Sequence, residues 1–171
     1  MPDNFTMQPQ QETEWCWAAT AASVHSYLNP GCPTIFTQAS LASTVLQQEK
    51  KIAPGFDCTG SPGSCDFPGS LTIALTTTGN LNTALGRPME FSEIKAALDN
   101  GNPVCVQIDW YSGGGHAIAI DGYFEYASGA QVVSVQDPLL PGATLHFYDA
   151  LKTGYQASGV WADTFTVQRH P

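Results

Sequence analysis

The hydrophobic pattern of this chain changes its period at Gly101, and this change constrains the fold more than any other feature. Before Gly101, apolar residues recur at three- and four-residue spacing, which is typical of amphipathic helices. After it, apolar and polar residues alternate in short runs separated by Gly, Ser and Pro, which is typical of β-strands. Helices first and antiparallel strands second predict an α+β fold, in which a helical layer meets a sheet along one seam.

Four helices are expected before this point. The first covers about residues 15–28 and ends at an Asn-Pro-Gly sequence. Thr37 is placed to cap a second helix, and a short third helix begins after Ser70. Ser92 is the expected cap of the fourth helix, which ends before Gly101. The expected strands are PVCVQIDW, GHAIAIDGYFEY, GAQVVSVQDP, ATLHFYD and GVWADTFTVQ.

Length and charge narrow the class of protein. A chain of 171 residues without an internal repeat or linker predicts a single domain over residues 1–171. A formal net charge of −9, from 15 acidic and 6 basic residues, repels phosphate backbones. Nucleic acids and anionic membranes are therefore not expected partners, and no apolar run has the length of a membrane span.

The chain has five cysteines, and their number indicates the cellular compartment in which the protein works. If one is a working thiol, four remain, an even number that could form two disulfides, and this suits a secreted protein. Cys58 and Cys65 bracket a loop rich in Gly, Pro and Ser, so their pairing is sterically easy, but four cysteines allow three connectivities and the sequence does not choose. The first ten residues have neither the basic start nor the apolar core of a signal peptide, which suits a cytosolic protein or a mature secreted form.

A candidate catalytic set accompanies this pattern. Cys16 lies between two tryptophans at the expected start of the first helix, where the helix dipole favours negative charge on sulfur. His116 follows three glycines at the start of a strand, and Asp137 ends another strand just before a proline. Gln10 stands six residues before Cys16. A thiol nucleophile, an imidazole base, a group that orients it and an oxyanion donor are the parts that a cysteine peptidase needs.

These residues carry a resemblance to a known family. The sequence Gln-x5-Cys-Trp-Ala, the later Gly-His-Ala-Ile-x-Ile-x-Gly-Tyr and the Asp-Pro at a strand end resemble the papain-like cysteine peptidases. Within them the chain looks most similar to the bacterial branch that includes the avirulence-effector proteases. The resemblance implies a monomeric peptidase with a protein or peptide substrate and no cofactor or metal. It implies Cys16 as nucleophile, His116 as base and then acid, Asp137 as the group that orients His116, Gln10 as oxyanion donor, and Trp17, Gly114 and Gly115 at the substrate.

The sequence departs from papain at the third member, where Asp137 stands in place of an asparagine. Bacteriocin-leader peptidases share the Gln-x5-Cys spacing, but they usually have Gly after the cysteine, where this chain has Trp17, and they are attached to a transporter. Trp161 could shield the His–Asp pair from water or pack in the core. Zinc is a weak alternative because no Cys-x2-Cys or His-x3-His pair occurs.

Two other functions remain open. Cys-His-Asp is also the arrangement of transglutaminases and deamidases, in which the acyl group passes to an amine or is hydrolysed from a glutamine side chain. The glutamine six residues before the cysteine favours the peptidase. The same fold could also serve as a catalytically silent binding module, although the complete set of four residues argues against lost activity.

Overall fold

A computed structural model describes residues 5–170. Its helices are α1 (Cys16–Leu28), α2 (Gln38–Gln48), α3 (Leu71–Thr77), α4 (Phe91–Asp99) and α5 (Tyr148–Gly154), with a 3-10 turn η1 (Pro62–Cys65). The strands are β1 (Leu81–Ala84), β2 (Val104–Trp110), β3 (Gly115–Glu125), β4 (Gln131–Gln136), β5 (Ala143–Phe147) and β6 (Gly159–Val167). The predicted α+β fold is confirmed: N-terminal helices precede one antiparallel six-stranded sheet.

The sheet has the order β1-β6-β2-β3-β4-β5. Its central strand β2 pairs with β3 on one side and β6 on the other, and alternating residues along it enter opposite cores. Val104, Val106 and Ile108 share one face as predicted, while Cys105 is buried on the other.

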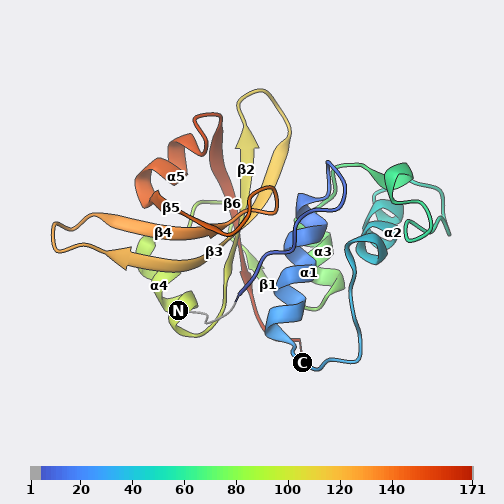
Figure 1. The fold of residues 1–171 in the computed structure, drawn as a ribbon, viewed down its shortest axis with the longest axis horizontal. Helices are drawn as coiled ribbons and strands as arrows, with labels where there is room; N and C mark the ends of the chain where they lie inside the picture. The colour runs from blue at the N-terminus through green and yellow to red at the C-terminus, as the bar shows by residue number, and fades with distance from the viewer. Residues whose placement is uncertain (1–4, 171) are drawn as a thin grey trace.

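Helices cover both faces of this sheet (Figure 1). The α1–α3 layer packs against Cys105, Ala117 and Ala119, and α4 and α5 pack against the opposite face. The expected arrangement of one helical layer along one seam is therefore incomplete. Strands β2 and β3 are apolar on both faces, and each face needs a cover of its own to exclude water.

The first helix follows the predicted stripe, since Trp17, Ala21, Val24 and Leu28 are all buried. Thr37 caps α2 as predicted, and the third helix begins after Ser70 as predicted, with Ser70 as its cap; each side chain accepts a backbone N–H three residues along its helix.

The predicted cap of α4 was wrong. Glu90 occupies the N-cap position, and a reciprocal pair of bonds with Glu93 satisfies the first turn. Ser92 lies inside the helix. Two elements were not expected: β1, which pairs with β6 at the sheet edge, and α5, which begins where the strand sequence ATLHFYD ends. None of the helices in the described part of the chain combines the length and apolar character needed to cross a bilayer.

Candidate active site

Cys16 is the first residue of α1, so its thiol lies where the backbone N–H groups have no partners within the helix. Trp15 occupies the N-cap position, and its side chain makes no capping bond to these groups. An uncapped helix N-terminus carries a partial positive charge and attracts anionic groups. Cys16 is also only half-buried, which gives a substrate access to the sulfur.

Residues 56–69, which we call the wall loop, pack against the start of α1. Three hydrogen-bond donors on either side of Cys16 in the sequence bond to this loop. They are the Glu14 N–H to Asp66 Oδ1 at 2.7 Å, the Trp15 Nε1–H to the Cys65 carbonyl at 2.8 Å, and the Trp17 Nε1–H to the Phe67 carbonyl at 3.3 Å. The two tryptophans that flank the thiol therefore fix the wall loop beside it.

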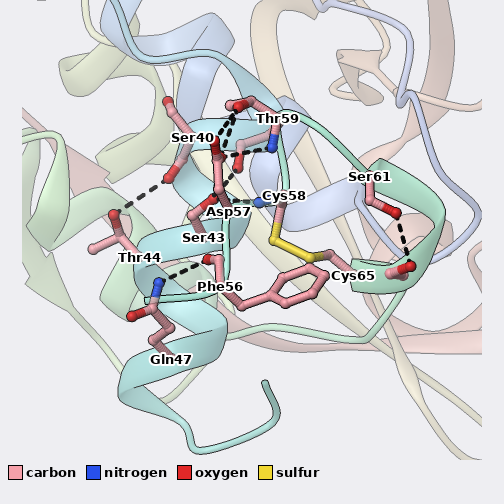
Figure 2. The surroundings of a disulfide bond; sticks show 12 residues. Ser40, Ser43, Thr44, Gln47, Phe56, Asp57, Cys58, Thr59, Ser61 and Cys65 are labelled. Atoms are coloured by element: carbon pink, nitrogen blue, oxygen red, sulfur yellow. Dashed lines mark hydrogen bonds between the residues drawn. A yellow bond between two sulfur atoms is a disulfide. The ribbon is translucent and has the colours of Figure 1, made fainter. Parts of the chain in front are cut away.

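The other end of the wall loop is attached to α2 (Figure 2). Ser43 Oγ accepts the Cys58 N–H at 2.9 Å, and the Gln47 amide donates to the Phe56 carbonyl at 3.0 Å. A disulfide between Cys58 and Cys65 cross-links the loop, and Figure 2 shows it next to the bond between Ser43 and Cys58. The loop is thus held at both ends and cross-linked between them.

A small cleft of about 100 Å³ lies between the wall loop and the sheet. Cys16, Trp17, His116 and Gly115 line it, together with Glu14, Pro68, Gly69, Gln107 and Ala117. A Cβ atom on Gly69 would lie 2.4 Å from the Trp17 ring, so only a glycine lets the loop approach this closely. The structure therefore brings Cys16 and His116 to one opening, with Trp17 and Gly115 beside them.

Gly114 lies just outside this cleft. Its carbonyl accepts the Trp110 N–H at 3.0 Å, and its φ of +81° belongs to the left-handed region that favours glycine. Gly114 therefore shapes the turn between β2 and β3 that leads to His116, and it is not among the residues that line the cleft.

His116 and Asp137 form a buried pair. His116 is the second residue of β3, Asp137 follows the last residue of β4, and the two strands are antiparallel neighbours. His116 Nε2 lies 2.8 Å from Asp137 Oδ1, with exposed fractions of 4% and 1% for the two residues. Burial lowers the pKa of His116, but hydrogen bonds to Asp137 and to Cys16 outweigh burial and raise it to about 9. The imidazole is therefore held in its protonated form beside the thiol.

Asp137 stays ionised because its carboxylate is saturated with donors. Oδ1 accepts the Leu139 N–H at 2.8 Å in addition to His116, and Oδ2 accepts the Tyr155 hydroxyl at 2.6 Å and the Gln156 amide at 3.4 Å. Burial raises the pKa of Asp137, but these bonds, led by that to His116, lower it below its usual value of 3.8. Tyr155 was not identified from the sequence, because no local motif surrounds it.

An aromatic ring covers His116, but it is not the one expected. Trp110, at the end of β2, stacks on the imidazole with 5.6 Å between ring centroids and 22° between ring planes. Trp161 lies in the core beneath α5, where its Nε1–H donates to Thr164 Oγ1 at 2.9 Å. Of the two roles considered for Trp161, core packing is the one it has.

The Gln10 side chain forms hydrogen bonds within its own turn. Its Nε2 donates to the carbonyls of Glu12 and Thr13 at 3.0 and 2.5 Å, while Oε1 is buried without a partner. The Gln10 backbone N–H donates to the Pro138 carbonyl at 3.1 Å, which links this segment to the residue that follows Asp137. Within residues 5–170 no hydrogen bond joins the Gln10 side chain to Cys16. Catalytic hydrogen bonds often form only when substrate is bound.

Other cysteines and histidines lie in settings without this chemistry. A hollow of about 300 Å³ is lined by Cys32 and His170, with no carboxylate among its lining residues. Burial raises the pKa of Cys105 to about 12, so that thiol is unreactive at neutral pH. His25 is a buried structural residue bonded to Asn80 and the Thr34 carbonyl. Over residues 5–170, no three His, Cys, Asp or Glu side chains gather in a way that could hold a metal ion.

Comparison with known proteins agrees with this geometry. Residues 2–166 match the model of the "Peptidase_C39 like family". No curated protein sequence matches the chain. Among solved structures, the chain is similar to the bromelain protease from Ananas comosus in complex with the E64 inhibitor, with a TM-score of 0.50 and 16% sequence identity. That similarity covers 95% of this chain and 93% of bromelain, and it shows that the fold is papain-like.

Proposed function

Because the chain belongs to the Peptidase C39-like family of cysteine peptidases and has the papain-like fold, we propose that it is an endopeptidase with a Cys16-His116-Asp137 triad. One observation carries the proposal: the buried 2.8 Å bond between His116 and Asp137, on an imidazole that lines the same cleft as Cys16. In this proposal residues 1–171 form one catalytic domain, which acts as a monomer.

In the proposed reaction, His116 uses Nε2 to bond to Asp137, which leaves Nδ1 to exchange a proton with Cys16. The Cys16 thiolate attacks the carbonyl carbon of the scissile peptide bond, and His116 gives its proton to the leaving amine. A water molecule, deprotonated by His116, then hydrolyses the thioacyl-enzyme and releases the thiol. Asp137 remains ionised throughout and holds the imidazole in place.

The oxyanion that forms at the attacked carbonyl needs donors. The backbone N–H of Cys16 at the start of α1 and the Gln10 amide are the proposed pair. Since the Gln10 amide hydrogens bond to the Glu12 and Thr13 carbonyls, one of these bonds must be exchanged for the oxyanion bond as the intermediate forms. Trp17, Gly114 and Gly115 remain proposed substrate contacts.

Labelling with an epoxysuccinyl thiol-protease inhibitor of the E64 type tests this function. We expect one modified residue, Cys16, in a peptide map by mass spectrometry, and no labelling of a Cys16→Ala variant. Cys16→Ala and His116→Ala should both abolish hydrolysis of dye-labelled casein while the thermal unfolding transition is retained. A Cys32→Ser variant is the matched control and should behave as the wild type. Full casein hydrolysis by Cys16→Ala would refute the assignment.

Acyl transfer on the same triad is distinguished by its product. Incubation with casein and a fluorescent primary amine should yield cleaved peptides and no fluorescent casein if water is the acceptor. Amine incorporation without cleavage would instead indicate a transglutaminase. The finer resemblance to the avirulence-effector branch is a proposal that the sequence motifs support, and it makes a protein of another organism a candidate substrate.

We also infer that the protein acts in an oxidising compartment, outside the cell. The Cys58–Cys65 disulfide supports this, because disulfides are rare in reducing compartments. The other three cysteines, Cys16, Cys32 and Cys105, are free. Titration of the unfolded, unreduced protein with a thiol reagent should therefore count three thiols. Five would mean that the disulfide does not form and would contradict the inferred location.

A further inference from the structure

We propose that Tyr155 is a positioning residue of the active site, whose hydroxyl holds one oxygen of Asp137 so that the other oxygen faces His116. This inference rests on the proposed triad and adds a fourth residue to it. Tyr155 follows the last residue of α5, a helix on the far side of the sheet from α1 (Figure 1). Its function therefore depends on the layer that was not expected from the sequence.

The two oxygens of Asp137 have separate tasks. Oδ1 accepts His116 Nε2 at 2.8 Å, and Oδ2 accepts the Tyr155 hydroxyl at 2.6 Å. Asp137 and Tyr155 are each 1% exposed, so water cannot replace either bond. Without the Tyr155 hydroxyl, the Gln156 amide at 3.4 Å would be the one donor left to Oδ2 among the described residues, and this long bond would leave the carboxylate freer to turn about its Cβ–Cγ bond. The Tyr155 hydroxyl removes this freedom, since any turn would leave a buried donor and a buried charge poorly paired.

The backbone after Tyr155 is strained in a way that keeps this hydroxyl in place. Gln156 and Ala157 have φ values of 49° and 57°, in the left-handed region that residues other than glycine rarely adopt. The Tyr155 carbonyl accepts the N–H groups of Ser158 and Gly159, each at 3.0 Å, and closes the turn. Strain of this kind persists where the surrounding structure requires it, and it is common at functional sites. Here the turn also brings the Gln156 amide to Asp137 Oδ2.

The Tyr155 ring connects the same parts of the site through stacking. Trp110 stacks on Tyr155 at 6.1 Å and 25°, and its own ring stacks on His116. His146 contacts Tyr155 from β5, with 5.3 Å between ring centroids. The titratable groups around Asp137 are thus His116 from β3, His146 from β5 and Tyr155 after α5. A change to phenylalanine keeps every ring contact and removes only the hydroxyl.

The reaction rate of Cys16 with iodoacetamide at pH 6 tests the inference without any knowledge of the natural substrate. An ordinary thiol is almost fully protonated at pH 6, so alkylation of Cys16 faster than that of Cys32 reports the imidazolium of a correctly placed His116 beside the sulfur. The variant is Tyr155→Phe, with Cys16 modification followed by mass spectrometry. Tyr148→Phe is the matched control, because Tyr148 is also buried and its hydroxyl donates to the Met89 carbonyl at 2.8 Å, away from Asp137.

We expect Tyr155→Phe to slow Cys16 alkylation by about tenfold, as for a lost hydrogen bond to a charged group. Tyr148→Phe should react at the wild-type rate, although both variants lose a similar amount of thermal stability. In an Asp137→Ala background, Tyr155→Phe should have no further effect, because the residue acts only through that carboxylate. If Asp137→Ala does not fold, the alkylation rates of the Tyr155→Phe and Tyr148→Phe variants still test the inference.

Two results would overturn this inference and leave the proposed triad standing. One is a Tyr155→Phe variant whose Cys16 is alkylated at the wild-type rate. The other is a double variant whose alkylation rate falls by the product of the Tyr155→Phe and Asp137→Ala effects. Slow alkylation of wild-type Cys16 at pH 6, no faster than that of Cys32, would instead overturn the proposed triad and this inference with it.

Discussion

At the scale of single residues, the two oxygens of Asp137 explain why an aspartate can stand where papain has an asparagine. Oδ1 accepts from His116 and the Leu139 N–H, which an asparagine carbonyl oxygen could also do. Oδ2 accepts from Tyr155 and Gln156, which an asparagine NH₂ group could not do. The aspartate is therefore matched to the donors on its far side as well as to the imidazole.

Asp137→Asn should consequently be milder than Asp137→Ala without being neutral. The Tyr155 hydroxyl can rotate and accept from the new NH₂ group, so we expect about a tenfold loss of kcat/KM. Asp137→Ala leaves His116 without orientation and should lose about 10² to 10⁴-fold. Loss of the negative charge lowers the pKa of His116 from about 9, so the alkaline limb of the pH–rate profile should move to lower pH in both variants. Wild-type activity of Asp137→Ala would show that another group orients His116.

Gln10→Ala tests the proposed oxyanion donor. Its amide should stabilise charge that exists only in the transition state, so we expect kcat to fall by about 10² to 10³-fold while KM changes little. The neighbouring Gln11→Ala is a matched control, because its side chain is exposed and takes no part in the site. An unchanged kcat with a raised KM would assign Gln10 to substrate binding in the ground state.

At the scale of elements, regular periodicity and caps could be predicted, but contacts between distant segments could not. The stripe of α1, the cap Thr37 and the start of α3 after Ser70 are local patterns, and the structure confirms them. Short elements carry too little periodicity: β1 has four residues and α5 has seven. Tyr155 meets Asp137 only because α5 returns to the end of β4. No spacing rule relates two residues placed by separate elements.

The catalytic set itself was suggested by motifs that are short in sequence, such as the six-residue separation of Gln10 and Cys16. The pairing of His116 with Asp137 needed the register of β3 against β4, which the alternation of apolar residues does not specify. Trp110 illustrates the same limit. Its place on the apolar face of β2 was expected, but its stacking on His116 follows from the turn that joins β2 to β3.

The wall loop is cross-linked by the Cys58–Cys65 disulfide. Two of its residues, Pro68 and Gly69, line the cleft. Its carbonyl groups accept hydrogen bonds from the two tryptophans beside Cys16. Replacing both Cys58 and Cys65 with serine should lower the unfolding free energy by about 2–4 kcal/mol. It should also raise KM more than it lowers kcat, because the wall loop lines the cleft while the His116–Asp137 pair lies on the sheet. Cys32→Ser, which removes a free thiol, is the control. An unchanged KM in the double variant would mean that the loop is rigid without its cross-link.

At the scale of the whole molecule, the site joins the two layers and its charges contribute to stability. Cys16 belongs to the α1–α3 layer, while His116 and Asp137 lie on the sheet, and the Gln10 segment crosses between them through its bond to Pro138. The thiol, the imidazole and the carboxylate are therefore brought together only by folding. A group that is better stabilised in one protonation state by folding makes the free energy of unfolding depend on pH.

His116 determines the direction of this dependence. Its pKa is about 9 in the folded chain, against an ordinary histidine pKa of 6.5, so the folded state holds the proton more tightly. The stabilisation is fully present below pH 6.5 and is lost as the pH rises through 9, a loss of about 3 kcal/mol. Asp137 acts in the opposite range, because its pKa is lowered from 3.8 and its contribution to stability is lost as the pH falls below that value.

Urea unfolding of the protein without reductant should therefore show greatest stability between about pH 4 and 6.5. His116→Gln, which cannot take up a proton, should have a nearly flat stability between pH 6 and 9.5. If the wild type is equally flat over that interval, the protonated imidazole is not a feature of the folded protein, and Cys16 would have to be activated by the α1 N-terminus alone.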